Sequence, residues 1–515
     1  MPSGQFSARH WPLGFLVVIA AFGGLSTSAA FEPYGLWPLA IIAVAAVSWA
    51  ARRTRRLGSA VLVGWSFGLS FMATSLWWQT NILPESYLGL TFVTSLMYAA
   101  VGGLIKAVQP LPGTLLWSAS VWSLGEWVLS VWPFEGFMWL RLGYTQVDSP
   151  LAGYYPLVGA ATVSFLVALL GQLIVGLLEQ ISVRRALTGT LAGAVVLGVG
   201  LAGQLWTPPR PDAGTATVGW VQGGAPGGGI YGLGPPRTTT KNHVAETAEL
   251  MAAVATGDYP EPDFIVWPES STDLDPRYDS QTRALVESAV RDAGRPIFVG
   301  APFAGPGPDE RQTVSIWWTS DGPQDVYQKQ NLVPFGEWIP FRSVLLPLIP
   351  QLQYVGAQGI PGTAPGVVDA TLADGTELTL GVAICYEVNY PETLFEAQQA
   401  GADLMTVVSS NAMYQGTNQI EQQFAITRVR AAEMRRELLV VTTSGVSGRI
   451  GARGEVLWKG PNQIGASGVE EMPLGSPVTP AMALSAPVEW LLAGLGIIGV
   501  GGGILRRVQS RRTAS

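Results

Sequence analysis

Long apolar segments, separated by short polar connections, occupy the N-terminal part of this 515-residue chain. A helix needs about 20 apolar residues to cross the hydrocarbon core of a bilayer. Because that core offers the backbone no water, each crossing segment must be a helix whose backbone groups are paired internally. The sequence predicts such spans at residues 12–30, 35–50, 59–79, 88–108, 113–131, 156–180, 187–206 and 484–505.

The composition agrees with a membrane protein. Hydrophobic residues make up 48% of the chain and charged residues 13%, whereas soluble domains contain about 25% charged residues. The net charge is -7, and the chain lacks the strongly basic character that is typical of nucleic-acid-binding domains. We therefore predict membrane lipid, and not nucleic acid, as a partner. Residues 12–30 are alternatively a cleavable signal peptide, because Ser28-Ala29-Ala30 are small, but the spans that follow favour a retained helix.

Lysine and arginine concentrate in a few short segments, and their distribution predicts the orientation of the chain. With eight spans every basic cluster falls on one side, whereas seven or nine spans would place the last cluster on the other. The clusters contain Arg9, Arg52, Arg53, Arg55, Arg56, Lys106, Arg184, Arg185, Arg506, Arg507, Arg511 and Arg512. We therefore predict a multi-pass protein of the cell (inner or plasma) membrane with both termini in the cytoplasm.

This count divides the chain into three parts. Residues 1–206 are predicted to form a membrane domain of seven transmembrane helices, and residues 207–483 a domain on the periplasmic or extracytoplasmic side. Residues 484–515 are predicted to form the eighth transmembrane helix and a basic cytoplasmic tail. The loops at residues 77–78, 84–87 and 133–151 then lie outside, where their Trp and Tyr residues suit the membrane interface.

Residues 207–483 contain short β-type runs, bounded by Gly, Pro and Asp, that alternate with helical stretches. The predicted strands are residues 216–222, 263–267, 296–300, 314–318, 378–385, 403–409 and 438–443. The predicted helices are residues 237–256, 281–292, 391–400 and 419–436. Alternation of this kind predicts a layered α/β domain.

The chain has a single cysteine, Cys385, and two histidines, His10 and His243. A Ser-His-Asp enzyme or a histidine-rich metal site is therefore improbable, and we predict neither a metal nor a cofactor. Cys385 ends the apolar run 378–384, and catalytic groups of α/β sheets often lie at the carboxyl ends of strands. A buried structural cysteine is the alternative interpretation.

Two other polar residues follow predicted strands of the same domain. Glu269 ends the run Ile265 to Pro268, and Lys329 follows Val326-Tyr327-Gln328. A thiol with a pKa near ~8.5 needs a base or a nearby cation. A carboxylate in a dry pocket can take its proton, and an ammonium can stabilise an oxyanion. Alternatively, Glu269 is a loop carboxylate or helix cap and Lys329 lies in a solvated loop.

These residues carry a resemblance to a known family. Trp267-Pro268-Glu269, Lys329 with residues 334–337 (Pro-Phe-Gly-Glu), and Cys385-Tyr386-Glu387 resemble the Glu-Lys-Cys signatures of the nitrilase superfamily. Residues 136–146 (GFMWLRLGYTQ), 221–223 (VQG) and 430–433 (RAAE) resemble apolipoprotein N-acyltransferases. The resemblance covers nearly the whole chain, spans included.

The resemblance implies an α-β-β-α nitrilase sandwich joined to a membrane domain of about eight helices. It implies an acyltransferase that moves a fatty acyl chain from a phospholipid to the α-amino group of the N-terminal diacylglyceryl cysteine of an apolipoprotein. By motif position Cys385 is the nucleophile, Glu269 the base and Lys329 the group that stabilises the intermediate. The supporting residues are the backbone N–H of Tyr386, Glu337, which holds Lys329, and Glu387.

The sequence departs from the family pattern around residues 409–414, which read Ser-Ser-Asn-Ala-Met-Tyr where many members read Ser-Asn-Asp-Ala-Trp-Phe. The departures therefore include Asn411, Met413 and Tyr414. Gln423 replaces a common His, Met138 a common Pro and Gly224 a common Asn. None of these positions is catalytic, so they bear on lipid and peptide binding more than on the reaction.

Two rival functions and one mobile element remain as alternatives. A membrane-anchored nitrilase-type amidase needs no eight-helix platform. A transporter usually carries charges within its spans, where Glu126 and Glu179 are the clear candidates, both near span ends. Residues 338–357 are apolar enough to dip into the bilayer as a gate, or to pack as an ordinary loop.

Overall fold

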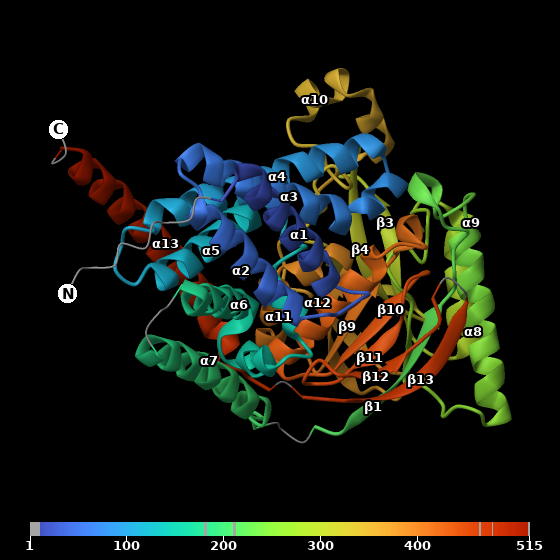
Figure 1. Cartoon of the computed structure of the whole chain (residues 1–515). Coiled ribbons are helices and arrows are strands. Elements are labelled where there is room, and N and C mark those ends of the chain that lie inside the picture. Colours follow the sequence, from blue (N-terminus) through green and yellow to red (C-terminus); the bar gives the residue numbers. More distant parts are fainter. Residues whose placement is uncertain (1–10, 180–182, 210–212, 463–464, 476, 513–515) are drawn as a thin grey trace. The chain divides into compact units, whose positions relative to one another are not determined.

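The computed structural model describes residues 11–179, 183–209, 213–462, 465–475 and 477–512 (Figure 1). They divide into two compact units. The membrane unit contains the described residues up to Thr80, those from Pro84 to Trp206 and those from Ala483 onward. The catalytic unit contains Asn81–Leu83 and the described residues from Thr207 to Met482. Arg9 and His10 lie outside the described residues.

Each predicted span contains one long helix. The helices are α1 (Leu13–Ala30), α2 (Pro38–Arg53), α3 (Leu57–Ser75), α4 (Pro84–Val108), α5 (Thr114–Val131), α6 (Tyr155–Glu179), α7 (Val183–Gln204) and α13 (Ala481–Arg512). By length and composition, six of them can cross a membrane, namely all except α2 and α5. α2 has only 16 residues, and α5 contains Glu126 among several serines and tryptophans. The prediction of a polytopic helical domain is confirmed.

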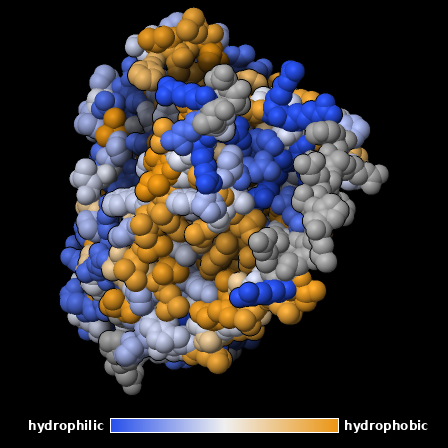
Figure 2. All heavy atoms as spheres, turned by 60° about the vertical axis from the view of Figure 1, so that its left-hand side comes forward, coloured by the Kyte–Doolittle hydropathy of each residue, from blue (hydrophilic) through white to orange (hydrophobic). Residues whose placement is uncertain are grey.

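Large apolar side chains of the membrane unit point outward, away from the interior of the helix bundle. Phe22, Leu88 and Leu191 are each more than half exposed, and Figure 2 shows broad apolar areas on the face that it draws. A continuous apolar surface of this kind is rare on a soluble monomer and suits contact with lipid tails.

Glycines bring α3 and α4 close together. A Cβ atom on Gly64 would lie 2.2 Å from the carbonyl oxygen of Tyr98, and one on Gly102 would lie 2.5 Å from that of Ala60. Membrane helices gain little from hydrophobic association, so close backbone approach through small residues stabilises their packing. A larger side chain at either glycine would force the two helices apart.

The connection between α5 and α6 is largely buried within the membrane unit, although the sequence predicts it as a loop at the outer interface. It contains the 3-10 helices η2 (Leu142–Gln146) and η3 (Pro150–Tyr154). Glu126 accepts a hydrogen bond from the backbone N–H of Leu142 at 2.9 Å. Arg141 Nη1 donates to Glu489 Oε1 at 2.8 Å. The neighbouring helices thus satisfy polar groups of an irregular segment that is buried inside the protein.

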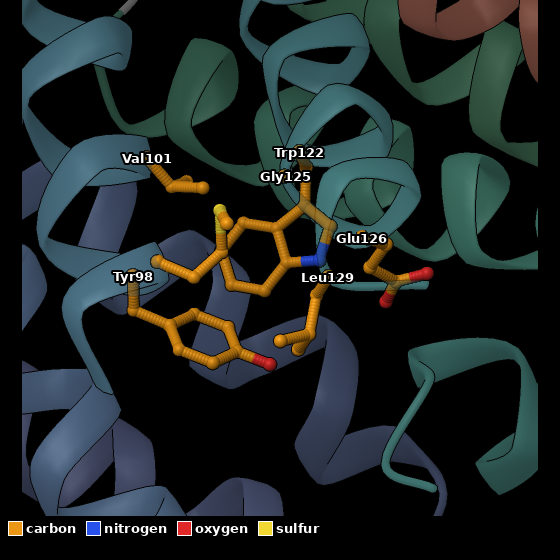
Figure 3. A pocket seen from close by; sticks show the side chains of 7 residues that line it. Tyr98, Val101, Trp122, Gly125, Glu126 and Leu129 are labelled. Carbon is orange, nitrogen blue, oxygen red and sulfur yellow. The ribbon is translucent and has the colours of Figure 1, made fainter. Parts of the chain in front are cut away.

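A small cavity of about 10 Å³ lies between α4 and α5. Figure 3 shows the rings of Tyr98 and Trp122 beside this space and the carboxylate of Glu126 turned away from it. Glu179 pairs with Arg52 at 2.8 Å. Glu126 and Glu179, the two span carboxylates on which the transporter alternative rested, therefore both have protein partners.

The catalytic unit contains two sheets. The first has the order β13-β1-β2-β3-β4-β5, with β6 paired to β4, and the second has the order β12-β11-β10-β9-β8-β7. The first sheet consists of β1 (Thr215–Gln222), β2 (Phe264–Val266), β3 (Ile297–Ala304), β4 (Glu310–Thr319), β5 (Gly322–Gln328), β6 (Gln358–Gly359) and β13 (Ala466–Pro473). The second consists of β7 (Val367–Thr371), β8 (Glu377–Ile384), β9 (Leu404–Ser409), β10 (Leu438–Thr442), β11 (Gly448–Ile450) and β12 (Val456–Lys459).

The two sheets pack face to face, with a helical layer on each outer side. Val218, Phe264 and Trp317 of the first sheet share one core with Leu380 and Leu439 of the second. The other face of the first sheet packs on α8 (Thr238–Thr256) and α9 (Ser280–Ala293). α11 (Pro391–Gln399) and α12 (Gln419–Met434) lie on the side of the second sheet (Figure 1). The predicted α-β-β-α sandwich is confirmed.

His243 of α8 is fully buried against the ring of Trp267, with ring centroids 5.6 Å apart. Burial lowers its pKa to about 4, compared with about 6.5 in an unfolded chain. The unfolded state therefore binds more protons between pH 6.5 and pH 4. The free energy of unfolding is therefore unaffected by His243 above pH 6.5, and it decreases as the pH falls from 6.5 towards 4.

We expect the free energy of unfolding of the catalytic unit to fall by about 2 kcal/mol between pH 7 and pH 5 through His243 alone. His243→Gln cannot gain the proton, so it should lose less stability over this interval than the wild-type protein. Thermal unfolding in detergent at the two pH values measures the difference. Equal losses in both proteins would show that His243 does not titrate in this way.

Candidate active site

The three predicted catalytic residues lie just beyond the ends of three strands. Cys385 follows β8 and opens the 3-10 helix η6 (Cys385–Asn389) with a backbone φ of +55°. This left-handed conformation is uncommon for a residue other than glycine and often marks a functional site. Glu269 lies three residues beyond the end of β2, and Lys329 directly follows β5. The sheet order thus brings together residues that are far apart in the sequence.

Lys329 lies between two carboxylates. Its Nζ atom is 3.1 Å from Glu269 Oε1 and 2.9 Å from Glu337 Oε1, and only 1% of its side chain is exposed. Burial alone would lower the pKa of Lys329, but the charges of Glu269 and Glu337 outweigh it and raise the pKa well above its ordinary value. Lys329 is therefore a permanent cation.

Glu269 is fixed on both of its carboxylate oxygens. Oε1 accepts from Lys329, and Oε2 accepts from the backbone N–H of Ser410 at 2.9 Å. The backbone oxygen of Glu269 accepts from Thr443 Oγ1 at 2.8 Å. Ser410 follows β9 and Thr443 follows β10, so the second sheet positions a carboxylate that belongs to the first. These contacts of Ser410 and Thr443 are not apparent from the sequence.

The thiol of Cys385 is held in its protonated form at rest. Burial raises its pKa well above the ordinary value, and the charge of Glu269 raises it further, although the charge of Lys329 lowers it. This arrangement suits a nucleophile that transfers its proton to a carboxylate only when it attacks.

Glu387 is fully buried and joins the Cys385 turn to the segment after Lys329. Its Oε2 accepts from the N–H of Ile384 at 2.7 Å, and its Oε1 accepts from the Tyr327 hydroxyl and the Gln330 N–H, each at 2.7 Å. Burial raises the pKa of Glu387 in spite of these donors. Loss of its carboxylate would release both segments at once.

Tyr386, Asn411 and Gln423, which the sequence also singled out, lie in segments that adjoin this site. Tyr386 follows Cys385 in η6 and is buried, with its ring 5.7 Å from that of Tyr390. Asn411 Nδ2 donates to Gln423 Oε1 at 2.7 Å, and Gln423 Nε2 donates to Ser409 Oγ at 2.6 Å. Two departures from the family pattern therefore form one polar network beneath the turn that carries Ser410.

Tyr414 ends the 3-10 helix η7 (Ala412–Tyr414) and is the departure nearest to the chemistry. Burial raises the pKa of its hydroxyl, and the charge of Glu337 raises it further. The phenol is thus neutral. The sequence marks Tyr414 only as a departure from the family pattern, and the structure adds that it is influenced by the charged residues of this site.

Residues 338–357 contain α10 (Arg342–Leu348) and the 3-10 helix η5 (Pro350–Val355). Phe341 and Leu348 are each more than 70% exposed. This segment presents apolar side chains outward, as the sequence predicts. Among the described residues, His, Cys, Asp and Glu form no group of three or more that could hold a metal ion.

Comparisons with known proteins bear on both units. Residues 23–173 match the family model described as apolipoprotein N-acyltransferase N-terminal domain, and residues 229–463 match the model of carbon-nitrogen hydrolase. An apolipoprotein N-acyltransferase of Mycolicibacterium smegmatis is 31% identical over 84% of this chain and 75% of its own length. One of Azotobacter vinelandii is 27% identical over 97% of this chain and 96% of its own length.

Solved structures also resemble the chain. An amidase of Nesterenkonia sp. AN1, with an acetamide moiety added covalently at its active-site cysteine, is 16% identical and has a TM-score of 0.38. The match covers 55% of this chain and 96% of the amidase.

The electrostatics of the site predict how Cys385 reacts with iodoacetamide, a neutral reagent that modifies the thiolate. Glu269→Gln removes the charge that raises the thiol pKa and leaves Lys329 less neutralised. We therefore expect alkylation at pH 8 to become faster, on the order of 10-fold for one pKa unit. Mass spectrometry of the intact protein measures the rate, and a single cysteine makes the assignment unambiguous.

Glu377→Gln is the matched control, because Glu377 is an exposed carboxylate at the start of the strand that ends before Cys385. This variant should react at the wild-type rate. Slower or unchanged alkylation in Glu269→Gln would mean that the charge of Lys329, and not that of Glu269, has the larger effect on the pKa of the thiol.

Proposed function

Because this chain belongs to the apolipoprotein N-acyltransferase family, we propose that Cys385, Glu269 and Lys329 carry out its acyl transfer. The chain is a membrane-embedded acyltransferase, and its family implies a lipid acyl donor and a lipoprotein acceptor in general. The observation that carries the assignment of residues is the buried contact of Lys329 with Glu269 beside the protonated thiol of Cys385.

In the first half-reaction the donor is a membrane phospholipid. Sγ of Cys385 attacks the carbonyl carbon of the acyl ester, and Glu269 accepts the thiol proton. The tetrahedral oxyanion is stabilised by the ammonium of Lys329 and by the backbone N–H of Tyr386. Its collapse breaks the ester bond, Glu269 returns the proton to the departing oxygen, and a lysophospholipid leaves. The acyl chain remains on Cys385 as a thioester.

In the second half-reaction the acceptor is the N-terminal S-diacylglyceryl cysteine of an apolipoprotein. Its neutral α-amine attacks the thioester carbonyl, and Glu269 accepts a proton from the attacking nitrogen. The carbon–sulfur bond breaks, the proton passes to the sulfur of Cys385, and the acceptor carries a new amide. Lys329 keeps its charge through both steps, because the charge of Glu337 still raises its pKa while Glu269 carries the transferred proton.

The organisation around the site suits two lipid substrates. We assign residues 1–206 and 484–515 to the membrane, with seven helices and an eighth, and residues 207–483 to the periplasmic or extracytoplasmic side. The exposed apolar side chains Phe341 and Leu348 support a role for residues 338–357 as a gate that enters the bilayer. The amidase alternative is less supported, since the relatives match the membrane half as well as the catalytic unit.

A thioester that waits for an amine must be protected from water. With phospholipid alone, we expect a burst of roughly one lysophospholipid per enzyme followed by a stop. A synthetic diacylglyceryl-cysteine peptide should restart turnover and receive the acyl group on its amine. Lysophospholipid release against time, with and without peptide, distinguishes this course from hydrolysis, which would continue at the same rate without peptide.

Cys385→Ser is the control for this experiment, because it keeps the shape of the side chain but presents a far less acidic hydroxyl. It should show neither burst nor acyl adduct while its thermal unfolding stays close to wild type. Normal turnover in this variant would assign Cys385 a structural role.

The predicted orientation is tested by reporter fusions. An enzyme that is active only outside the cytoplasm should work when inserted at Gly305, which lies between β3 and β4 of the catalytic unit. The same reporter should be inactive when fused after Ser515. Activity at Ser515 would contradict the even number of spans, which is the count that places every basic cluster on the cytoplasmic side.

A further inference from the structure

One end of the membrane unit brings together cations from three helices. Arg52 and Arg53 lie in the last turn of α2, and Lys106 in the last turn of α4. Arg506 and Arg507 lie near the end of α13. None of these residues takes part in the proposed chemistry, which is confined to the catalytic unit.

Hydrogen bonds show that these cations converge. Lys106 Nζ donates to the backbone oxygen of Arg52 at 2.8 Å, and the guanidinium of Arg507 donates to the backbone oxygen of Lys106. Arg506 Nη1 donates to the backbone oxygen of Pro110 at 2.6 Å. α13 approaches α4 closely here, because a Cβ atom on Gly503 would lie 2.4 Å from the oxygen of Ala107.

These bonds cap the carbonyl ends of α2 and α4, which lack partners within their helices. Capping does not neutralise the charge. Among the described residues, Glu179 is the carboxylate paired with this cluster, 2.8 Å from Arg52 Nη2 and 3.8 Å from Arg53 Nε. Five cations and one carboxylate leave a net charge of +4 at this end of the bundle.

Arg52 supplies a second, independent observation. Its side chain is 8% exposed, and Nη1 and Nη2 donate to Thr114 and Glu179. Its Nε atom is buried and has no hydrogen-bond partner in the described part of the chain. A buried charged donor without an acceptor is costly, and an anion bound beside the Arg52 guanidinium would offset part of that cost through its charge.

The surface beside the cluster is apolar. Ile504, Leu505 and Val508 of α13 and Leu57 at the start of α3 are each more than 40% exposed. A ligand that places oxygen acceptors among the cations and hydrocarbon along these side chains would match both features. Anionic phospholipid is such a ligand, and basic pockets between membrane helices bind lipid headgroups in this manner.

We propose that Arg52, Arg53, Lys106, Arg506 and Arg507 form a binding site for the phosphate of an anionic phospholipid, in the leaflet that the basic end of the bundle faces. The headgroup neutralises the excess charge, and its acyl chains lie along α13. The site has no nucleophile, so the lipid is retained and not consumed. It holds the ends of α2, α4 and α13 together.

The test compares lipids on the full-length protein in a neutral detergent. Phosphatidylglycerol should raise the unfolding temperature and survive as an adduct in native mass spectrometry, whereas phosphatidylcholine should do neither. Lys106→Gln/Arg506→Gln should weaken phosphatidylglycerol binding on the order of 30-fold, because it removes two cations that each contribute about 1 kcal/mol. Both side chains are at least partly exposed, and the buried Arg52 is left intact.

Arg55→Gln/Arg56→Gln is the matched control, because these two exposed arginines lie just beyond α2 but outside the cluster. It should bind phosphatidylglycerol as the wild-type protein does. Equal loss in both double variants would reduce the effect to general electrostatics and overturn the proposal. Equal stabilisation by phosphatidylcholine, or by inorganic phosphate alone, would overturn it as well.

If Lys106→Gln/Arg506→Gln does not fold, two other measurements test the same site. Arg506→Gln alone should bind phosphatidylglycerol more weakly, and the wild-type protein should prefer phosphatidylglycerol when the two lipids compete. Both variants should still form the thioester on Cys385, because neither alters the catalytic unit. Loss of lipid preference with an intact thioester would therefore count against this site and not against the proposed acyl transfer.

Discussion

The contact of Lys329 with Glu269 and Glu337 is the interaction on which the catalytic unit depends. A single buried cation is strongly unfavourable, and a buried ion pair is tolerated only when its remaining hydrogen bonds are satisfied. Lys329 therefore requires both carboxylates, and Glu269 in turn requires the N–H of Ser410. Removing any one of these groups would leave a buried charge of the site without one of its hydrogen-bond partners.

The sandwich makes this network possible because it places strand ends from two sheets at one location. β2 and β5 carry Glu269 and Lys329, whereas β8 and β9 carry Cys385 and Ser410. Glu387 joins the two sets, since it accepts from Ile384 at the end of β8 and from Gln330 after β5. The shared apolar core thus fixes the distance between nucleophile and base.

Sequence reasoning identified the spans, the layered domain and the residues with distinctive side chains. Apolar segments of about 20 residues are visible without any fold, and Glu269, Lys329 and Cys385 follow recognisable strands. The contribution of Ser410 depends on a backbone N–H, which every non-proline residue possesses, so only the sheet register reveals it. The burial of residues 139–147 was not predicted either, because the Trp and Tyr residues of this connection suit a membrane interface equally well, and only the structure shows that Glu126 of α5 and Glu489 of α13 pair with Leu142 and Arg141.

The left-handed backbone of Cys385 carries a consequence for how this enzyme evolves. A φ of +55° costs a residue with a side chain on the order of 1 kcal/mol that glycine would not incur. Cys385 also packs against the shared apolar core, and glycine would lose that contact. In a copy freed from selection, replacement by glycine would therefore exchange one local contribution to stability for another, so selection for activity and not for stability keeps the cysteine.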